Sequence, residues 1–406
     1  MASEATALKS SSREVSEVAK VPMTAADIHA NARAMSGFLR EQSVAIDEAR
    51  KLPPEVVARL REGGMFRLMM PKEWGGPEMR PAEQVEVIEE LAKANASAAW
   101  CVMIGCDSGF FAGYLDESAA REIYPRLDMS TAGSVTPTGR AERVAGGYRV
   151  TGQWSFGSGV SHADVVGLSC VLFENGAPVM KAKGTPVTFG LLSPAPEIEV
   201  VDNWHTTGMR GTGSSDYRAK DLFVPERFVF NLRPPAQRKG ILWSRSTNFL
   251  PKVSGVPLGA ARAAIDYVTE MMQTKVETMS GRPYKGMARI QSVIAEAEMI
   301  LGAARAYVFS AMDNEWARLE KGEQPTVRER ADAWLSRVNA AQSAREIIRM
   351  LYDAAGSTAI YTERTILDRA LRDAETFCQH IVAQKRTLEM IGGMLLGAES
   401  FLLPYV

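Results

Sequence analysis

Apolar residues recur at spacings of three and four through the first part of the chain, which is the pattern of amphipathic helices. Residues 97–114 differ because nearly all of them are apolar or small, which predicts a helix buried on every side. Asp107 is the exception in that stretch. It predicts either an acid at a helix turn, facing water or the edge of a pocket, or a group with a chemical role. The helical segments expected here are 23–50, with Thr24 as N-cap, 53–64, 81–96 and 97–114.

The pattern changes at about Met129. Residues 131–225 are rich in glycine, valine, threonine and serine, and short apolar runs alternate with turn residues such as Asn175–Gly176. This arrangement predicts a small antiparallel β barrel or sandwich. The strands expected from the apolar runs are 147–152, 165–172, 187–192 and 217–224.

Helical spacing returns after about residue 241, in long segments rich in alanine, leucine and methionine. Segments of this kind usually pack as an antiparallel bundle, here of four helices over 252–278, 287–320, 326–355 and 362–398. We therefore predict a mainly α fold with a central β domain. Its parts are a disordered tail over 1–22, a helical domain over 23–128, a β domain over 129–240 and a four-helix bundle over 241–406.

Composition and charge exclude several classes of protein. The formal net charge of the 406 residues is −1, which gives no case for nucleic acid or an anionic membrane as a partner. The four cysteines form no CxxC pair and the four histidines are widely spread, which argues against a metal site and favours a reducing compartment. The sequence shows neither an apolar run long enough to span a membrane nor a secretory signal. We expect a cytoplasmic protein.

Two segments of the β region carry candidate chemistry. Residues 153–159 place Trp154 and Phe156 at a strand end. They predict either a flat wall against a planar ring, to which Ser158 offers a hydroxyl or a backbone N–H, or ordinary strand packing with a serine turn. Residues 208–214 are rich in glycine but lie between predicted strands, so they do not predict a dinucleotide-binding turn.

A third candidate segment runs from Gly356 to His380. It begins with a glycine-serine-threonine turn and continues as a helix that ends at a lone histidine. This pattern predicts either a seat for an anionic or flavin-like group at the helix start, or a turn followed by an ordinary bundle helix.

Together these motifs resemble the acyl-CoA dehydrogenase superfamily, over about residues 23–402. The resemblance implies the fold predicted above: helices, a small β domain and a helical bundle. It rests on W-x-F-x-S-G at 154–159, W-x-x-T-G-M-R-G-T-G-S at 204–214, and the segments 71–76, 255–262 and 356–373.

The resemblance also distinguishes two branches of that superfamily. Dehydrogenases carry a glutamate base nine residues after the arginine of Arg372–Asp373, and here that position is Ile381. The second known location of the base, within 247–259, contains no acid. His380 instead resembles the histidine of flavin-dependent monooxygenases. Two alternatives stay open: a flavin dehydrogenase or oxidase with an unusual base such as Asp107, and a non-catalytic helical scaffold.

For the monooxygenase branch, the resemblance implies the oxygenase component of a two-component system. A separate NAD(P)H:flavin reductase supplies FMNH2 or FADH2, which reacts with O2. The resulting C4a-hydroperoxyflavin inserts one oxygen into a small, aromatic or heteroaromatic substrate. His380 is expected to protonate or hydrogen-bond the nascent peroxyflavin, and Ser158 to shape the environment of flavin N5. Such enzymes are usually homotetramers with flavin at an interface.

The resemblance gives supporting roles to further residues. Some phenol-hydroxylating members carry a histidine where this chain has residues 106–112. Its absence argues against carrying phenol specificity over, and leaves an indole, another heteroaromatic, a sulfur centre or an amine as candidate substrates. The expected ring-lining residues are Ser134, Trp154 and Phe156. Those at the flavin phosphate end are Arg282, Gln291, Gly356, Ser357 and Thr358, and those of the substrate pocket are Asp107, Phe110, Phe111 and Trp204.

Overall fold

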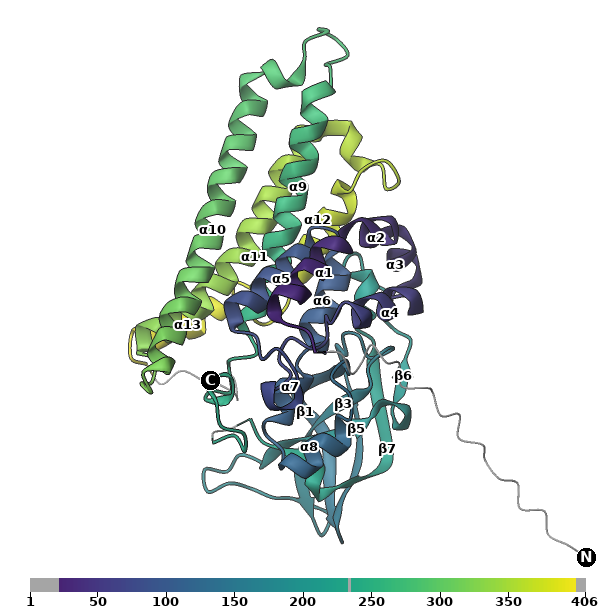
Figure 1. The fold of residues 1–406 in the computed structure, drawn as a ribbon, viewed down its shortest axis with the longest axis vertical. Coiled ribbons are helices and arrows are strands. Elements are labelled where there is room, and N and C mark those ends of the chain that lie inside the picture. Colours follow the sequence, from purple (N-terminus) through teal and green to yellow (C-terminus); the bar gives the residue numbers. More distant parts are fainter. Residues whose placement is uncertain (1–21, 233–234, 399–406) are drawn as a thin grey trace, which may run out of the picture.

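The computed structural model describes residues 22–232 and 235–398. Helices, a β sheet and a helical bundle follow one another along the chain, which confirms the predicted fold class. Most of the N-terminal helices lie between the bundle and the sheet in Figure 1. Apart from Pro22, the tail predicted over 1–22 falls outside the described residues.

The N-terminal helices are shorter than the sequence predicted. Thr24 caps the first one as expected, since the Asp27 N–H donates to Thr24 Oγ1 at 3.2 Å. The buried helix expected over 97–114 is broken at Cys106–Asp107, and Gly109 then lies so close to Met69 that a Cβ would come within 2.1 Å of the Met69 carbonyl oxygen. The helices are α1 Ala25–Ala34, α2 Ser36–Glu41, α3 Ser43–Ala49, α4 Pro54–Glu62, α5 Pro81–Ala92, α6 Ala96–Gly105, α7 Ser108–Ala112 and α8 Glu117–Ile123.

The described residues of the β domain form one eight-stranded sheet with the order β6-β7-β2-β1-β3-β5-β8, and β4 pairs with β3. Its pairings are antiparallel except that β1 runs parallel to β3, so the purely antiparallel prediction was wrong at that pair. The strands are β1 Thr131–Val144, β2 Gly147–Trp154, β3 Val165–Glu174, β4 Ala177–Pro178, β5 Thr188–Pro194, β6 Glu199–Val201, β7 Asp216–Pro225 and β8 Val229–Phe230.

The bundle contains α9 to α13, and its last predicted helix is split. Residues 378–386 form turns between α12 and α13, where Gln342 of α11 donates its side-chain N–H to the Ala383 carbonyl at 2.9 Å. This tertiary contact satisfies a carbonyl that a continuous helix would have paired internally. The helices are α9 Gly255–Thr274, α10 Ala288–Glu320, α11 Val327–Ala355, α12 Leu367–Phe377 and α13 Thr387–Leu395.

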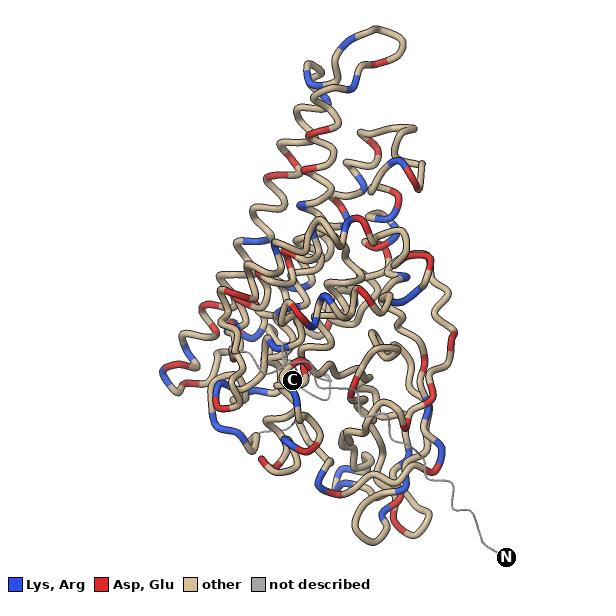
Figure 2. Tube along the Cα trace, turned by 45° about the vertical axis from the view of Figure 1, so that its right-hand side comes forward, with Lys and Arg blue, Asp and Glu red and all other residues tan. Residues whose placement is uncertain are grey.

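Close helix packing joins the N-terminal part to the bundle. Gly259 of α9 approaches α5 so closely that a Cβ there would lie 2.2 Å from the Glu89 carbonyl oxygen. Positively and negatively charged residues are interspersed along all three parts of the chain (Figure 2). Among the described residues, no helix is both long and apolar enough to cross a membrane.

Candidate active site

The two residues predicted to be catalytic, Ser158 and His380, meet through a tryptophan that the sequence did not single out. Trp100 of α6 donates its indole N–H to Ser158 Oγ at 3.0 Å. The ring of Trp100 also lies edge-on to the His380 imidazole, with 5.1 Å between centroids. Ser158 follows β2 and His380 follows α12, so the N-terminal part, the β domain and the bundle each contribute one residue.

A chain of hydroxyl groups continues from Ser158, and its donors can be assigned in order. Thr212 Oγ1–H donates to the Met209 carbonyl at 2.7 Å, so the Thr212 oxygen accepts from Ser214, also at 2.7 Å. The Ser214 hydrogen is then used, so Ser158 Oγ–H donates to Ser214 at 2.7 Å. Because Ser158 also accepts from Trp100, its hydroxyl keeps one lone pair and no free hydrogen. It can accept a hydrogen bond from a ligand.

His380 is a neutral imidazole at physiological pH. Burial lowers its pKa to about 4, because no partner compensates for desolvation of the charged form. The Val382 N–H lies 3.5 Å from Nδ1 of the ring, which is a long contact. The neutral ring can hold one proton and offer it, or accept one at the other nitrogen.

Phe156 is held in a strained backbone conformation with its ring exposed. Its φ is +65°, a value that bulky residues rarely adopt, and 70% of the residue is accessible. Its carbonyl accepts the Ser158 N–H at 2.9 Å, so that backbone donor is also occupied. The ring lies edge-on to Trp204 at 6.3 Å between centroids, and Trp204 donates its N–H to the Met209 carbonyl at 3.1 Å. The two aromatic rings form a wall beside Ser158.

The remaining residues predicted to line the ring lie elsewhere in the sheet. Trp154 has no exposed surface: its N–H donates to the Ser169 carbonyl at 2.7 Å and its ring stacks on Tyr217. Trp154 therefore packs in the core behind the site, in place of the predicted lining position. Ser134 is half-buried on β1, and its backbone N–H donates to Tyr217 Oη at 2.7 Å.

Apart from Trp204, the predicted substrate-pocket residues lie on α7 or directly before it. Asp107 forms a buried ion pair with Lys252, at 2.5 Å between Oδ1 and Nζ, and the two side chains are 7% and 1% exposed. Burial raises the pKa of Asp107 to about 6, although Lys252 opposes the shift. Phe110 is fully buried and Phe111 half-buried, and the rings of both lie within 6.4 Å of the Phe249 ring.

The residues predicted at the flavin phosphate end lie at the other end of the bundle. Gly356 has φ +62° and begins the turn after α11, where Lys275 donates to Thr358 Oγ1 at 2.9 Å. Arg282 is exposed in the α9–α10 connection, and Gln291 is exposed near the start of α10. Figure 1 shows this connection at the end of the molecule farthest from the sheet. Within one chain, this group and the Ser158–His380 group do not form one site.

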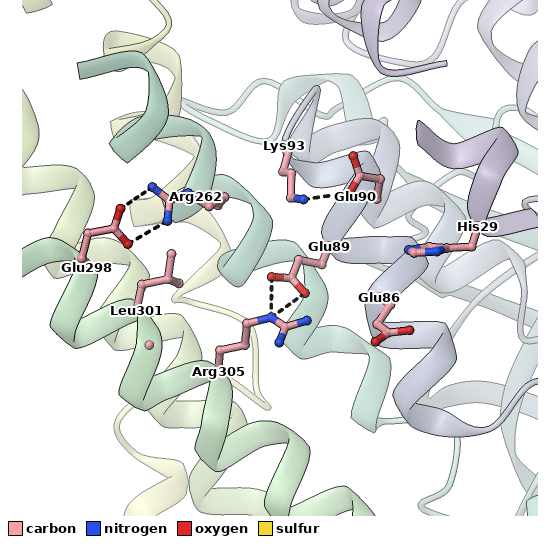
Figure 3. Close-up of a pocket in the computed structure, with 10 residues that line it drawn as sticks. His29, Glu86, Glu89, Glu90, Lys93, Arg262, Glu298, Leu301 and Arg305 are labelled. Carbon is pink, nitrogen blue, oxygen red and sulfur yellow. Dashed lines mark hydrogen bonds and ion pairs between the residues drawn. The ribbon is translucent and has the colours of Figure 1, made fainter. Parts of the chain in front are cut away.

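A charged pocket lies away from both groups. It measures about 400 Å³ and lies between α1 and α5 on one side and α9 and α10 on the other (Figure 3). Three ion pairs line it, formed by Arg262 with Glu298, Arg305 with Glu89, and Lys93 with Glu90. This lining suits charged or strongly polar ligands and differs from the aromatic wall beside Ser158. Within the described part of the chain, no three metal-ligating side chains cluster.

Comparison with known proteins identifies the family. Residues 28–125 match "Acyl-CoA dehydrogenase, N-terminal domain" and residues 253–385 match "Acyl-CoA dehydrogenase, C-terminal domain". The chain is 30% identical over 362 residues to the indole-3-acetate monooxygenase of Pseudomonas putida, which covers 87% of this chain and 89% of that protein. The chain belongs to the flavin-dependent monooxygenases of the acyl-CoA dehydrogenase superfamily.

Two further similarities agree with this monooxygenase family. The oxygenase subunit HsaA, a flavin-dependent monooxygenase of Mycobacterium tuberculosis H37Rv, is 31% identical over 353 residues, covering 83% of this chain and 86% of that protein. The crystal structure of 3-HSA hydroxylase from Rhodococcus sp. RHA1 superposes with a TM-score of 0.84 at 26% identity, covering 92% and 97% of the two chains. These names favour the monooxygenase prediction over the dehydrogenase alternative. They also confirm the prediction of a flavin cofactor.

The site residues fit a flavin ring, which presents an aromatic face and polar edge atoms. The exposed ring of Phe156, held at a strained φ, provides an apolar face. The free lone pair of Ser158 and the neutral imidazole of His380 provide an acceptor and a donor at the edge. Sequence reasoning missed Trp100, since a tryptophan within an apolar helix reads as core.

Proposed function

We propose that this chain is the oxygenase component of a two-component monooxygenase of the cytoplasm. It takes reduced flavin, FMNH2 or FADH2, from a separate NAD(P)H:flavin reductase and inserts one oxygen atom of O2 into a small aromatic or heteroaromatic substrate. The bound reduced flavin supplies the electrons that activate O2. The observation that carries the proposal is the set of hydrogen bonds that leaves Ser158 as an acceptor, with Trp100 joining it to a neutral His380.

Ser158 suits the reduced form of flavin in particular. Reduced flavin carries a hydrogen on N5, whereas oxidised flavin has a lone pair there. A hydroxyl whose own hydrogen is committed to Ser214 can accept from that N–H and offers nothing to the lone pair. Such a site retains the reduced cofactor in preference to the oxidised one, as an oxygenase that depends on a separate reductase requires.

His380 is the proton donor and acceptor of the proposed site. As a neutral imidazole it donates a hydrogen bond to an oxygen atom beside the ring and holds a proton there without adding a buried charge. Phe156 is exposed in the free chain, so together with Trp204 it would keep water from the same region once a flavin ring covers it. Both effects favour transfer of oxygen to substrate over release of hydrogen peroxide.

The far end of the bundle serves a neighbouring subunit in this proposal. Arg282, Gln291 and the turn of Gly356, Ser357 and Thr358 lie too far along the bundle to complete the site of their own chain. In a homotetramer they would hold the phosphate end of a flavin whose ring lies against the Ser158 of another copy. The cationic side chains of Arg282 and Lys275 and the hydroxyl groups of the turn suit an anionic group.

The substrate would lie along α6 and α7. Phe111 and Phe249 are half-buried on otherwise buried segments, so they offer accessible aromatic surface to a planar substrate. Phe110 supports them from the core, the buried pair of Asp107 and Lys252 lies beside Phe249, and Trp204 would border the substrate on the side of Phe156. An aromatic ring with a polar substituent fits this lining.

The test is a screen of small aromatic substrates with a flavin reductase, NADH and O2, scored by a mass gain of one oxygen. His380→Ala should lower product formed per NADH about 100-fold and release hydrogen peroxide instead. His29→Ala, on α1, is the matched control and should keep the wild-type ratio. Anaerobic bleaching of tightly bound oxidised flavin by an acyl-CoA, without any oxygenated product, would show a dehydrogenase instead.

A further inference from the structure

We infer that Asp373 is a positioning residue, which holds the segment 204–215 so that the Ser158 hydroxyl keeps its orientation toward the flavin ring. The inference rests on the proposed function. Asp373 is 4% exposed on α12, seven residues before His380, and touches neither Ser158 nor its hydroxyl partners directly. Its influence would pass through one residue, Met209.

Asp373 anchors Met209 by a short hydrogen bond. The Met209 N–H donates to Asp373 Oδ1 at 2.5 Å, and both residues are buried. Met209 has φ +52°, a left-handed conformation that costs a non-glycine residue energy unless its surroundings hold it. A buried carboxylate is itself costly, so its retention against one backbone N–H indicates that this peptide must be fixed.

The other side of Met209 carries the link to the site. Its carbonyl accepts both the Trp204 indole N–H at 3.1 Å and the Thr212 hydroxyl at 2.7 Å. The Thr212 hydroxyl is the end of the chain that passes through Ser214 to Ser158, so the carbonyl of Met209 decides the direction of every hydrogen in that chain. A shift of this one carbonyl would free the Ser158 hydrogen.

Two neighbouring contacts dock the same segment on α12. Arg372 donates from Nη1 to the Thr207 carbonyl at 2.7 Å. Gly208 lies against the helix so closely that a Cβ would be 2.0 Å from the Arg372 carbonyl oxygen. These contacts place the segment, and Asp373 adds the one bond that continues to Met209.

The experiment compares Asp373→Ala with Asp373→Asn, which keeps an acceptor oxygen, and with Glu375→Gln as control. Glu375 lies on the same helix and pairs with Arg349 of α11, away from segment 204–215. In the holoenzyme assay, Asp373→Ala should lower product per NADH about 10-fold with the substrate KM within about 2-fold, because a small misplacement impairs the reacting geometry rather than binding. Asp373→Asn should restore most of the loss, and Glu375→Gln should match the wild type.

Gly208→Ala tests the same docking from the other side, because its new Cβ meets helix backbone. It should reproduce the Asp373→Ala phenotype. Amide hydrogen exchange measures the positioning independently of activity. Peptides covering 155–160 and 204–215 should exchange faster in Asp373→Ala than in the wild type, and at the wild-type rate in Glu375→Gln. The inference would be overturned if Asp373→Ala and the wild type showed equal hydrogen exchange and equal coupling, meaning product formed per NADH consumed. A different result would overturn the proposed function alone: Asp373→Ala exchanges faster than the wild type, but the wild type forms no oxygenated product.

Discussion

Asp107 and Asp373 are both buried carboxylates, and burial raises the pKa of each to about 6. They differ in what compensates for burial. Asp107 faces a full positive charge on Lys252, whereas Asp373 accepts a backbone N–H from Met209. The ion pair ties α6–α7 to the segment before α9, and the N–H bond ties α12 to a loop of the β domain. Stability is therefore kept only if Asp107 is removed together with Lys252. Asp373 can be replaced by any neutral acceptor of the same shape.

The largest effect is expected from breaking the ion pair. Lys252→Met leaves Asp107 buried without its cation, which should lower the free energy of unfolding by about 3–5 kcal/mol. The double variant Asp107→Leu/Lys252→Met should recover most of that loss, because it removes both charges. Urea denaturation at pH 7 measures all three proteins. If the double variant is as unstable as the single one, the pair does not compensate for burial in the way described.

A pH series should separate the second carboxylate from the first. The pKa of Asp373 is raised, so the folded protein binds its proton more tightly than the unfolded chain, and this contribution to stability is lost as pH rises from about 4 to about 6. The charged groups that act on it are Arg369 and Arg372, which favour the ionised form, and Asp47, which opposes it.

In Asp373→Asn the same contribution is absent. The stability difference between this variant and the wild type should therefore change by up to about 1.4 kcal/mol for each pH unit between pH 5 and 6, and stay constant above pH 7. Asp107 titrates in both proteins and cancels. Unfolding free energies at pH 5, 6 and 7 measure the difference. Parallel curves for the two proteins would rule out titration of Asp373 in this window.

The smallest effect tests the link beyond Met209. Thr212→Val keeps the shape of the side chain and removes its hydroxyl, which should cost about 1 kcal/mol of stability and lower product per NADH without touching the ion pair. Thr188→Val, at the start of β5, is the matched control and should behave as wild type. Thermal unfolding and the coupling assay measure both variants. Wild-type coupling in Thr212→Val would limit the role of Met209 to packing.

The sequence predicted the order of the three parts and most helices, because helical periodicity is a short-range signal. The roles of Ser158 and His380 stay predictions. The sequence did not predict β1, since Pro137 and Gly139 interrupt the alternation where the strand bulges between Ser134 and Gly139. The break before α13 was missed as well, because it depends on Gln342, which is more than thirty residues away in the chain.

Other residues whose surroundings the sequence did not predict share this physical origin. Trp154 alternates correctly for a strand, but which face it occupies depends on Tyr217, its stacking partner from β7. Lys252 reads as a surface lysine, and its burial follows from Asp107 far along the chain. Trp100 reads as core, and its N–H gains a role from Ser158 on another part of the fold. The local sequence pattern indicates which interactions a residue can make. Contacts with residues far along the chain determine which of them it makes.

Segment 204–215 is held at once by contacts from α6, from α12 and from the turn 157–159 that follows β2. These contacts limit how chimeras of related monooxygenases can be built. Exchanging the β domain alone would separate Met209 from the Asp373 to which it was fitted. A working exchange would transfer the segment and α12 together. It would also keep Trp100, because its hydrogen bond to Ser158 must still form. The boundaries useful for recombination therefore differ from the boundaries between helices and sheet.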